Sequence, residues 1–244
     1  MSGAALATFV SCNKAGAAQQ YAEYLTKHPN DYEARFKKAY CHEVLQDFNQ
    51  ARKEYREIAS RTPIECVRTV ANALERATDR NESSRKDCTE ALERATEKYD
   101  GSFWVWHYYA ESLRVQGKSK DAIDAYEKAA TRNKNDMWNK TLLAETLREH
   151  GLKQTNENVR EQYRMKAKTR YKEVVNLSES PVTLAHVGLA LCYLAEGKVD
   201  KANKHMKIAH ETNPRLVASF QPRIQLNIAK RKVTGHYFRL IYVL

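Results

Sequence analysis

The segment from Phe103 to Asp136 contains two runs of residues, one before and one after Gly117, and each run is long enough to form a helix. Each run carries one stripe of apolar side chains. Within each stripe the side chains recur at intervals of three and four residues, which places them on one helix face. The first stripe consists of Trp106, Tyr109, Ala110 and Leu113, and the second of Ala122, Tyr126 and Ala129. Bulky side chains opposite small ones allow two helices to cross closely. The segment therefore predicts two packed helices joined at Gly117.

The small residue of the second helix recurs along the chain at a nearly constant spacing. Its equivalents are Ala17, Ala51, Cys88, Ala122, Ala167 and Ala202, with separations of 34, 37, 34, 45 and 35 residues. Units of this size bury their apolar faces by stacking on their neighbours along the chain. The larger separations indicate insertions. The spacing thus predicts an all-α array of stacked helix pairs.

The repeating pattern resembles the tetratricopeptide repeat, whose period is about 34 residues. The resemblance implies an all-α fold, a right-handed superhelix (α-solenoid) of five to six helix pairs with a capping helix. We expect the array to span residues 1–233, with a divergent unit at 66–101, an insertion at about 152–162 and a capping helix at about 217–231. Residues 234–244 fit no repeat, and the sequence predicts no structure for them.

The chain is basic, with 41 Lys and Arg residues against 30 Asp and Glu residues and a formal net charge of +11 at pH 7. Such an excess favours polyanionic partners, nucleic acid above all, or acidic membrane surfaces. A basic surface that serves only solubility is the alternative interpretation. The charge alone therefore leaves the partner open.

Several sequence features argue against other classes of function. The five cysteines are scattered and include no CxxC motif, which argues against a disulfide framework and a zinc site. No apolar run approaches the ~20 residues of a membrane span, and no secretory signal precedes the array. Gly-rich phosphate loops, HExxH and GxSxG motifs are missing from the sequence. We therefore expect a cytoplasmic protein that is not an enzyme and needs no membrane, metal or cofactor.

The helix expected at 103–116 has a second face, opposite the packed one, which should look into the groove of the array. This face carries Trp104, His107, Tyr108 and Glu111. Trp104, Glu111 and Arg114 recur 34 residues later as Trp138, Glu145 and Arg148. Flat rings beside guanidinium groups suit unstacked RNA bases, because the ring stacks and the cation meets phosphate. The same rings can instead pack against the adjacent unit, so both interpretations stay open.

Two subclasses of tetratricopeptide proteins provide functional comparisons. One subclass grips the C-terminal carboxylate of chaperones with Lys and Asn at fixed points on successive first helices. Residues such as Phe36, Tyr40 and His107 occupy those points here, so we expect this carboxylate clamp to be absent. The order of units, with the segment LAHVGLALCYLAEGKVDKA at 184–202, is more similar to the interferon-induced proteins with tetratricopeptide repeats, which bind RNA 5′ ends in a basic tunnel.

This second resemblance implies a non-catalytic RNA-binding protein of innate antiviral type that holds an RNA 5′ end or single strand. By position, that family's groove residues fall on Arg56, Trp104, Tyr108 and Arg114, while His107 stands where the family has Arg. The candidate groove residues are therefore Arg56, Trp104, His107, Tyr108, Arg114, Trp138 and Arg148. The alternative is a protein-interaction scaffold that holds a peptide or a partner helix in the same groove.

Overall fold

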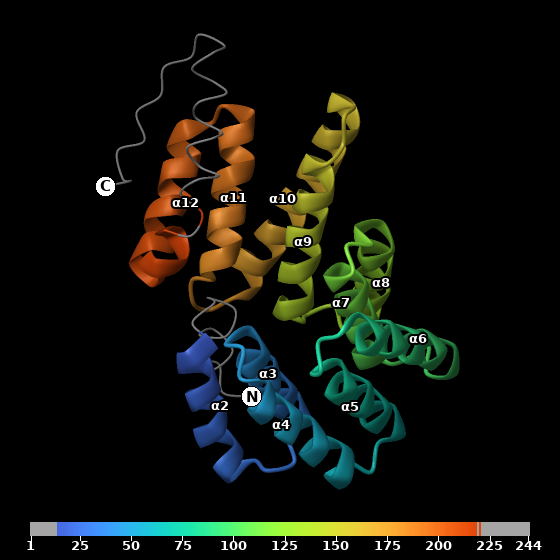
Figure 1. Cartoon of the computed structure of the whole chain (residues 1–244). Helices are drawn as coiled ribbons and strands as arrows, with labels where there is room; N and C mark the ends of the chain where they lie inside the picture. The colour runs from blue at the N-terminus through green and yellow to red at the C-terminus, as the bar shows by residue number, and fades with distance from the viewer. Residues whose placement is uncertain (1–13, 219, 221–244) are drawn as a thin grey trace. The chain divides into compact units, whose positions relative to one another are not determined.

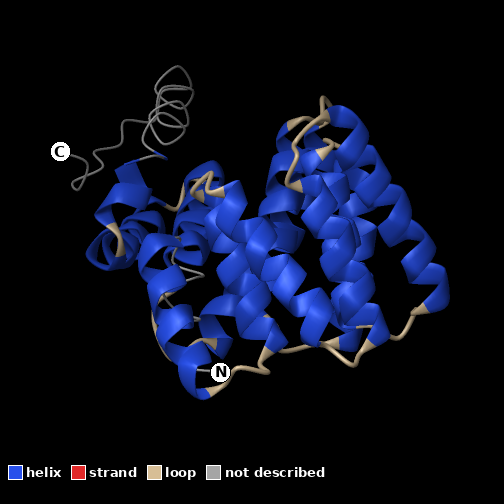
Figure 2. Cartoon of the chain, turned by 60° about the horizontal axis from the view of Figure 1, so that its bottom comes forward, coloured by secondary structure: helices blue, strands red, loops and turns tan. Residues whose placement is uncertain are grey.

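The computed structural model describes residues 14–218 and residue 220, and all regular elements in this part of the chain are α-helices (Figures 1 and 2). The chain forms two compact units, whose described residues are 14–139 in the first and 140–218 with 220 in the second. The boundary falls inside helix α9 (Met137–Leu152). The expected all-α fold class is confirmed.

The first unit consists of helices that pack in the order in which they follow one another. They are α2 (Lys14–Lys27), α3 (Tyr32–Val44), α4 (Phe48–Arg61), α5 (Glu65–Ala77), α6 (Glu82–Lys98), α7 (Phe103–Val115) and α8 (Ser119–Arg132). Each helix contacts the next, and α5 also contacts α7. The divergent unit expected at 66–101 therefore folds as a regular helix pair, α5 with α6.

Local sequence signals set several helix ends. The side chains of Asp31, Asp47 and Asn81 each accept a hydrogen bond from a backbone N–H in the first turn of the helix that follows. Such caps satisfy backbone donors that have no partner inside the helix. Gly117 follows α7 with φ of +79°, a left-handed conformation that glycine adopts without strain. The turn expected at Gly117 is therefore confirmed.

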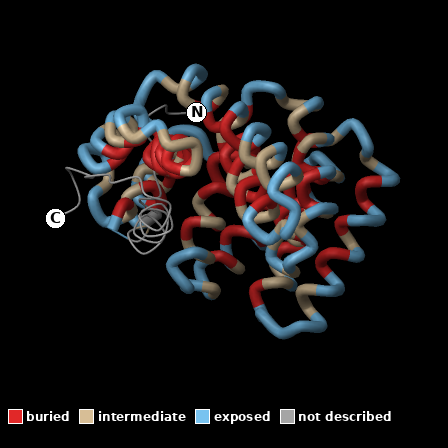
Figure 3. The backbone as a smooth tube through the Cα atoms, turned by 90° about the horizontal axis from the view of Figure 1, so that it is seen from above, coloured by how far each residue is buried: buried red, intermediate tan, exposed pale blue. Residues whose placement is uncertain are grey.

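The core of the first unit follows the expected stripes. Ala110, Ala122, Tyr126 and Ala129 are fully buried, and Leu113 is nearly so. Along α4, α6 and α8, buried residues alternate with exposed ones (Figure 3), as the period of three and four residues requires. Helix α7 differs, because it is buried on both faces and only Val115 is exposed. Cys88 is buried at the small-residue position of its repeat, and the described cysteines are free thiols.

The second unit contains the rest of α9 and the helices α10 (Glu157–Leu177), α11 (Thr183–Glu196) and α12 (Val199–Thr212). Residues 214–218 are also helical. The segment at about 152–162, where we expect an insertion, contains the end of α9 at Leu152, a short connector, and the start of α10 at Glu157. The two helices approach closely, because a β-carbon on Gly151 would lie 2.8 Å from that of Tyr163.

Some expectations concern residues that the structure does not describe. The opening helix at residues 1–13, most of the capping helix expected at 217–231, and the segment 234–244 lie outside the described residues. Within the described part, no helix combines the length and the apolar character that crossing a membrane requires.

Candidate functional site

The aromatic residues on the second face of α7 form one cluster with rings of α3 and of the first turn of α9, all within the first unit. The cluster consists of Phe36, Tyr40, Phe103, Trp104, His107, Tyr108 and Trp138. The ring centroid of Phe36 lies 5.5 Å from that of Trp104 and 5.0 Å from that of Tyr108. These distances are typical of attractive ring pairs in protein cores. Phe36 on α3 therefore reaches α7, two helix pairs further along the chain.

Burial decides what the aromatic cluster can contact. His107, Tyr108 and Trp138 are exposed by 0%, 1% and 3%, whereas Trp104 is half-buried. A base needs an open ring face to stack on, and these three buried side chains are surrounded by protein atoms. The structure therefore brings four of the seven candidate residues together, and of these four it leaves Trp104 partly accessible.

His107 carries no positive charge in this cluster at neutral pH. Burial lowers its pKa, and this effect outweighs the Asp136 carboxylate and the hydrogen bond with Asn139, which act in the opposite direction. Its Nδ1 atom lies 2.9 Å from Oδ1 of Asn139. The His107 side chain is thus neutral and hydrogen-bonded within the protein.

Arg114 is one part of a motif in which a carboxylate accepts bonds from an arginine and a tyrosine. Its Nη2 and Nε atoms donate to the Glu111 carboxylate at 2.6 and 3.1 Å, and the Tyr126 hydroxyl donates to the same carboxylate. Two parallel bonds of this kind fix a guanidinium strongly. We call this arrangement the Glu–Arg–Tyr motif.

The Glu–Arg–Tyr motif recurs in the second unit. Arg148 pairs with Glu145, and the Tyr171 hydroxyl donates to Oε2 of Glu145 at 2.5 Å. The expected 34-residue recurrence of Glu and Arg is therefore present, and in each copy the tyrosine comes from the helix that follows along the chain. The sequence pattern does not predict that these tyrosines bond to the carboxylates, because they lie 15 and 26 residues after them, at unequal distances.

The contribution of the Glu111 carboxylate to stability depends on pH. Burial alone would raise its pKa, but the charge of Arg114 and the bonds from Arg114 and Tyr126 outweigh burial, and the pKa lies below 4.5. The ionised carboxylate therefore stabilises the fold above pH 4.5, and this contribution is lost as the pH falls through the lowered pKa. We expect Glu111→Gln to cost about 2 kcal/mol at neutral pH.

Urea unfolding of the wild type and the Glu111→Gln variant at several pH values measures this difference. The difference in the free energy of unfolding between the two proteins should shrink as the pH falls below 4.5, the ordinary pKa of a glutamate carboxyl group. A gap that stays constant from neutral to acid pH would show that the charge of Glu111 makes no contribution.

Arg56 lies apart from the other candidates. Its side chain, on α4, is 65% exposed, and its Nε atom donates to Oε1 of Glu75 on α5 at 2.7 Å. An exposed ion pair of this kind contributes little stability. Arg56 is therefore accessible to a ligand, but it does not belong to the aromatic cluster.

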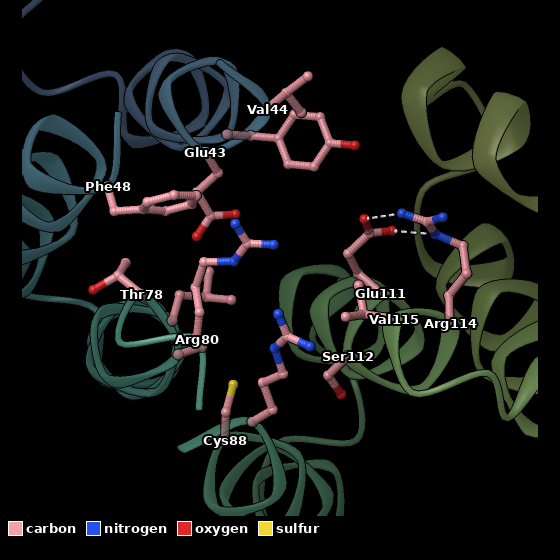
Figure 4. Close-up of a pocket in the computed structure, with 14 residues that line it drawn as sticks. Glu43, Val44, Phe48, Thr78, Arg80, Cys88, Glu111, Ser112, Arg114 and Val115 are labelled. Atoms are coloured by element: carbon pink, nitrogen blue, oxygen red, sulfur yellow. Dashed lines mark hydrogen bonds and ion pairs between the residues drawn. The ribbon is translucent and has the colours of Figure 1, made fainter. Parts of the chain in front are cut away.

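The first unit contains a cavity of about 250 Å³ at the C-terminal ends of α3, α5 and α7. We call it the helix-end cavity. Its charged lining residues are Glu43, Arg80, Arg85, Glu111 and Arg114, and its apolar ones include Val44, Phe48, Leu74, Ala77 and Val115. Figure 4 shows the side chains of Glu43 and Arg80 on one side, and the bonded pair of Glu111 and Arg114 on the other. Of the seven candidate groove residues, Arg114 lines this cavity.

Glu43 is acidic at a repeat position where two later repeats have arginine, Arg114 and Arg148. It precedes Arg114 by 71 residues, the distance that separates Ala51 from Ala122. Burial and the Glu111 carboxylate raise the pKa of Glu43 to about 7, although a hydrogen bond from Tyr55 and the charge of Arg80 act in the opposite direction. The change from Arg to Glu at this repeat position was the signal in the sequence that could have indicated the cavity.

Arg80 lies in the turn after α5 and lines the cavity. Its φ is 59°, in the left-handed region, which is uncommon for residues other than glycine. Its guanidinium carbon lies 4.7 Å from the ring centroid of Phe48, a distance at which cation and ring attract each other. Gln46 and Gly117 have the same left-handed conformation in the turns after α3 and α7, with φ of 63° and 79°, so this conformation belongs to the repeat.

The comparison by sequence identifies a repeat of known type in the first unit. The family named tetratricopeptide repeat matches residues 13–63, and no curated protein matches the chain. The matched segment spans α2, α3 and α4. Among the described residues, no three His, Cys, Asp or Glu side chains gather in a way that could hold a metal ion.

Solved structures extend the tetratricopeptide fold over most of the chain. The crystal structure of MamA is 18% identical, with a TM-score of 0.52 over 72% of this chain and 95% of that chain. YrrB, described as a tetratricopeptide-repeat protein with an unusual peptide-binding site, is 12% identical, with a TM-score of 0.52 over 84% and 99%. A monomeric mutant of IFIT1 with m7Gppp-AAAA is 17% identical, with a TM-score of 0.60 over 86% of this chain and 49% of that chain. These likenesses define a protein with the tetratricopeptide fold. The chain spans about half the length of the IFIT1 chain.

Proposed function

We propose that the chain is a non-catalytic interaction scaffold that binds a peptide segment of a partner protein in the helix-end cavity. The observation that carries this proposal is the contrast between the aromatic cluster and the helix-end cavity, both in the first unit. The rings of His107, Tyr108 and Trp138 are buried, whereas the helix-end cavity has both apolar and cationic lining residues. A concave site with apolar walls and a few polar groups is the usual form of a ligand site.

The rim of the helix-end cavity supports a protein partner. Val44 and Val115 line it and are 49% and 53% exposed, which is unfavourable in water for isolated valine side chains. Exposed apolar side chains beside polar ones are typical of interaction surfaces. The peptide-binding site named for YrrB, a protein of the same fold, also supports a peptide ligand.

Selection from a displayed library of short random peptides tests this function. We expect the enriched peptides to lose about tenfold or more in affinity when Ala77→Trp fills the cavity. Asn72→Trp is the matched control, because Asn72 lies on the same helix and is exposed. Enriched peptides that bind the Ala77→Trp variant as tightly as the wild type would contradict the proposal.

RNA binding of innate antiviral type is the second candidate function. The formal net charge of +11 and the likeness to the IFIT1 structure with m7Gppp-AAAA favour it. Here Arg56, Trp104 and Arg114 of the first unit would provide the accessible contacts. Arg148 belongs to the second unit, where its side chain is 7% exposed and paired with Glu145. Residues 221–244, which lie outside the described part of the chain, contribute five Lys or Arg and no Asp or Glu to this charge.

Fluorescence anisotropy with m7Gppp-AAAA over a series of salt concentrations tests the second candidate. Binding through several phosphates should weaken log-linearly with salt. A steep slope that Arg56→Ala reduces would favour RNA over a peptide. Flat binding curves at low salt would remove this candidate and leave the scaffold.

A further inference from the structure

The helix-end cavity contains two cations with no described anion of their own. Neither Arg80 nor Arg85 forms an ion pair with a carboxylate among the described residues, although Arg80 lies close enough to Glu43 to lower its pKa. Arg114 differs from both, because the carboxylate of Glu111 already binds its guanidinium. The cavity therefore has an excess of positive charge that a bound anion could neutralise.

The size and the apolar lining of the cavity restrict the ligand further. An apolar cavity of about 150 Å³ holds a benzene molecule. The helix-end cavity, of about 250 Å³, can therefore hold one apolar side chain together with a neighbouring carboxylate. Leu74 and Ala77, at the end of α5, provide apolar wall close to Arg80 along the chain.

We propose that the helix-end cavity binds an acidic segment of a partner protein, with a side-chain carboxylate on Arg80 and Arg85 and an adjacent apolar side chain against Leu74 and Ala77. This inference rests on the proposed peptide-binding function and specifies its ligand. A guanidinium donates two parallel hydrogen bonds to a carboxylate, which gives geometric specificity as well as affinity. Charge complementarity argues for an acidic segment over a basic or a purely apolar one.

Glu43 makes this binding dependent on pH, because its carboxylate competes with the ligand for Arg80. The titratable and charged groups that face Glu43 are Tyr55 of α4, Arg80 of the α5–α6 turn, Cys88 of α6, and Tyr108 and Glu111 of α7. The pKa values of the Cys88 thiol and of both tyrosines are raised, and that of Glu111 is lowered. Of these groups, Glu43 alone titrates near pH 7.

The direction of the pH effect follows from the charge of Glu43. Below pH 7 its carboxyl group is protonated and neutral, so Arg80 has no competing anion. A ligand carboxylate stays ionised at that pH because its ordinary pKa is about 4. Affinity for an acidic segment should therefore rise as the pH falls from about 8 to about 6. The Glu43→Gln variant should show no such pH dependence. At about pH 8 it should bind the acidic segment as tightly as the wild type binds it at about pH 6.

A fluorescein-labelled peptide of alternating Glu and Leu residues, with an amidated C-terminus, is the probe for this inference. Its control replaces every Glu by Gln, and a free-acid version of that control separates a side-chain carboxylate from a terminal one. We expect Arg80→Ala and Arg85→Ala each to weaken binding of the Glu–Leu probe about tenfold. Arg94→Ala should leave it unchanged, because Arg94 is exposed on α6 and does not line the cavity.

Several outcomes would overturn the inference. They are equal binding of the Glu and Gln probes, wild-type affinity in both arginine variants, and tighter binding of the free-acid Gln control than of the amidated Glu probe. Glu43→Gln provides an independent test, since it should increase affinity at about pH 8 even where Arg80→Ala impairs folding. If displayed peptides bind in the cavity but lack acidic residues, the proposed function stands and this inference fails. If no peptide binds, both fail.

Discussion

Replacing Tyr108 by alanine is expected to lower the free energy of unfolding by about 3–5 kcal/mol, the usual cost of deleting a buried aromatic ring. Tyr108 is 1% exposed, and its ring contacts those of Phe36, Trp104 and Trp138. The variant would leave a cavity in the centre of the aromatic cluster. Urea unfolding followed by circular dichroism measures the loss.

Tyr108→Phe is the matched control, because it retains the ring and removes the hydroxyl. That hydroxyl is buried and has no hydrogen-bond partner among the described residues. Leaving a buried polar group unpaired is unfavourable, so its removal should be neutral or slightly stabilising. A Tyr108→Ala variant as stable as the wild type would show that the ring faces an open groove, as a base-stacking site requires.

Replacing Gly188 by alanine should destabilise the second unit by about 3 kcal/mol, at the upper end of the usual cost of overpacking. A β-carbon at this position would lie within 2.6 Å of three ring carbons of Tyr171. The ring cannot withdraw easily, because it is fully buried and its hydroxyl is bonded to Glu145. Thermal unfolding of the variant should therefore show a lower transition temperature than that of the wild type.

Gly101→Ala provides the comparison for the Gly188 variant. No atom lies within 4 Å of a β-carbon built on Gly101, so the added methyl group meets open space. We expect a change in stability close to zero. If the two alanine variants unfold at the same temperature, the close contact between α10 and α11 at Gly188 is not rigid.

The helix pairs could be predicted from the sequence because their determinants are local and repeated. Ala122 and Tyr126 lie on one helix face at a spacing of four, and equivalent residues recur at almost constant intervals. Capping residues such as Asp31 and Asp47 also act within a single helical turn. Each repeat thus specifies its own pair without information from distant parts of the chain.

The candidate site was harder to predict because its surroundings depend on contacts between distant repeats. The sequence places Trp104 and Tyr108 on the second face of α7, but whether that face is open depends on Phe36, which lies about 70 residues earlier. The role of Arg114 depends in the same way on Glu111 and on Tyr126 of the next helix. Side-chain type and spacing do not reveal which partner a ring or a guanidinium has already taken.

Hydrogen–deuterium exchange tests most directly whether the helix-end cavity, and not the face of the aromatic cluster, is the binding surface. The wild-type chain would be compared alone and with the tightest peptide from the display selection. We predict that protection on binding concentrates in residues 78–85 and 111–115, because both segments contain residues that line the cavity. Protection concentrated at residues 103–108, with none at the α5–α6 turn, would contradict this account.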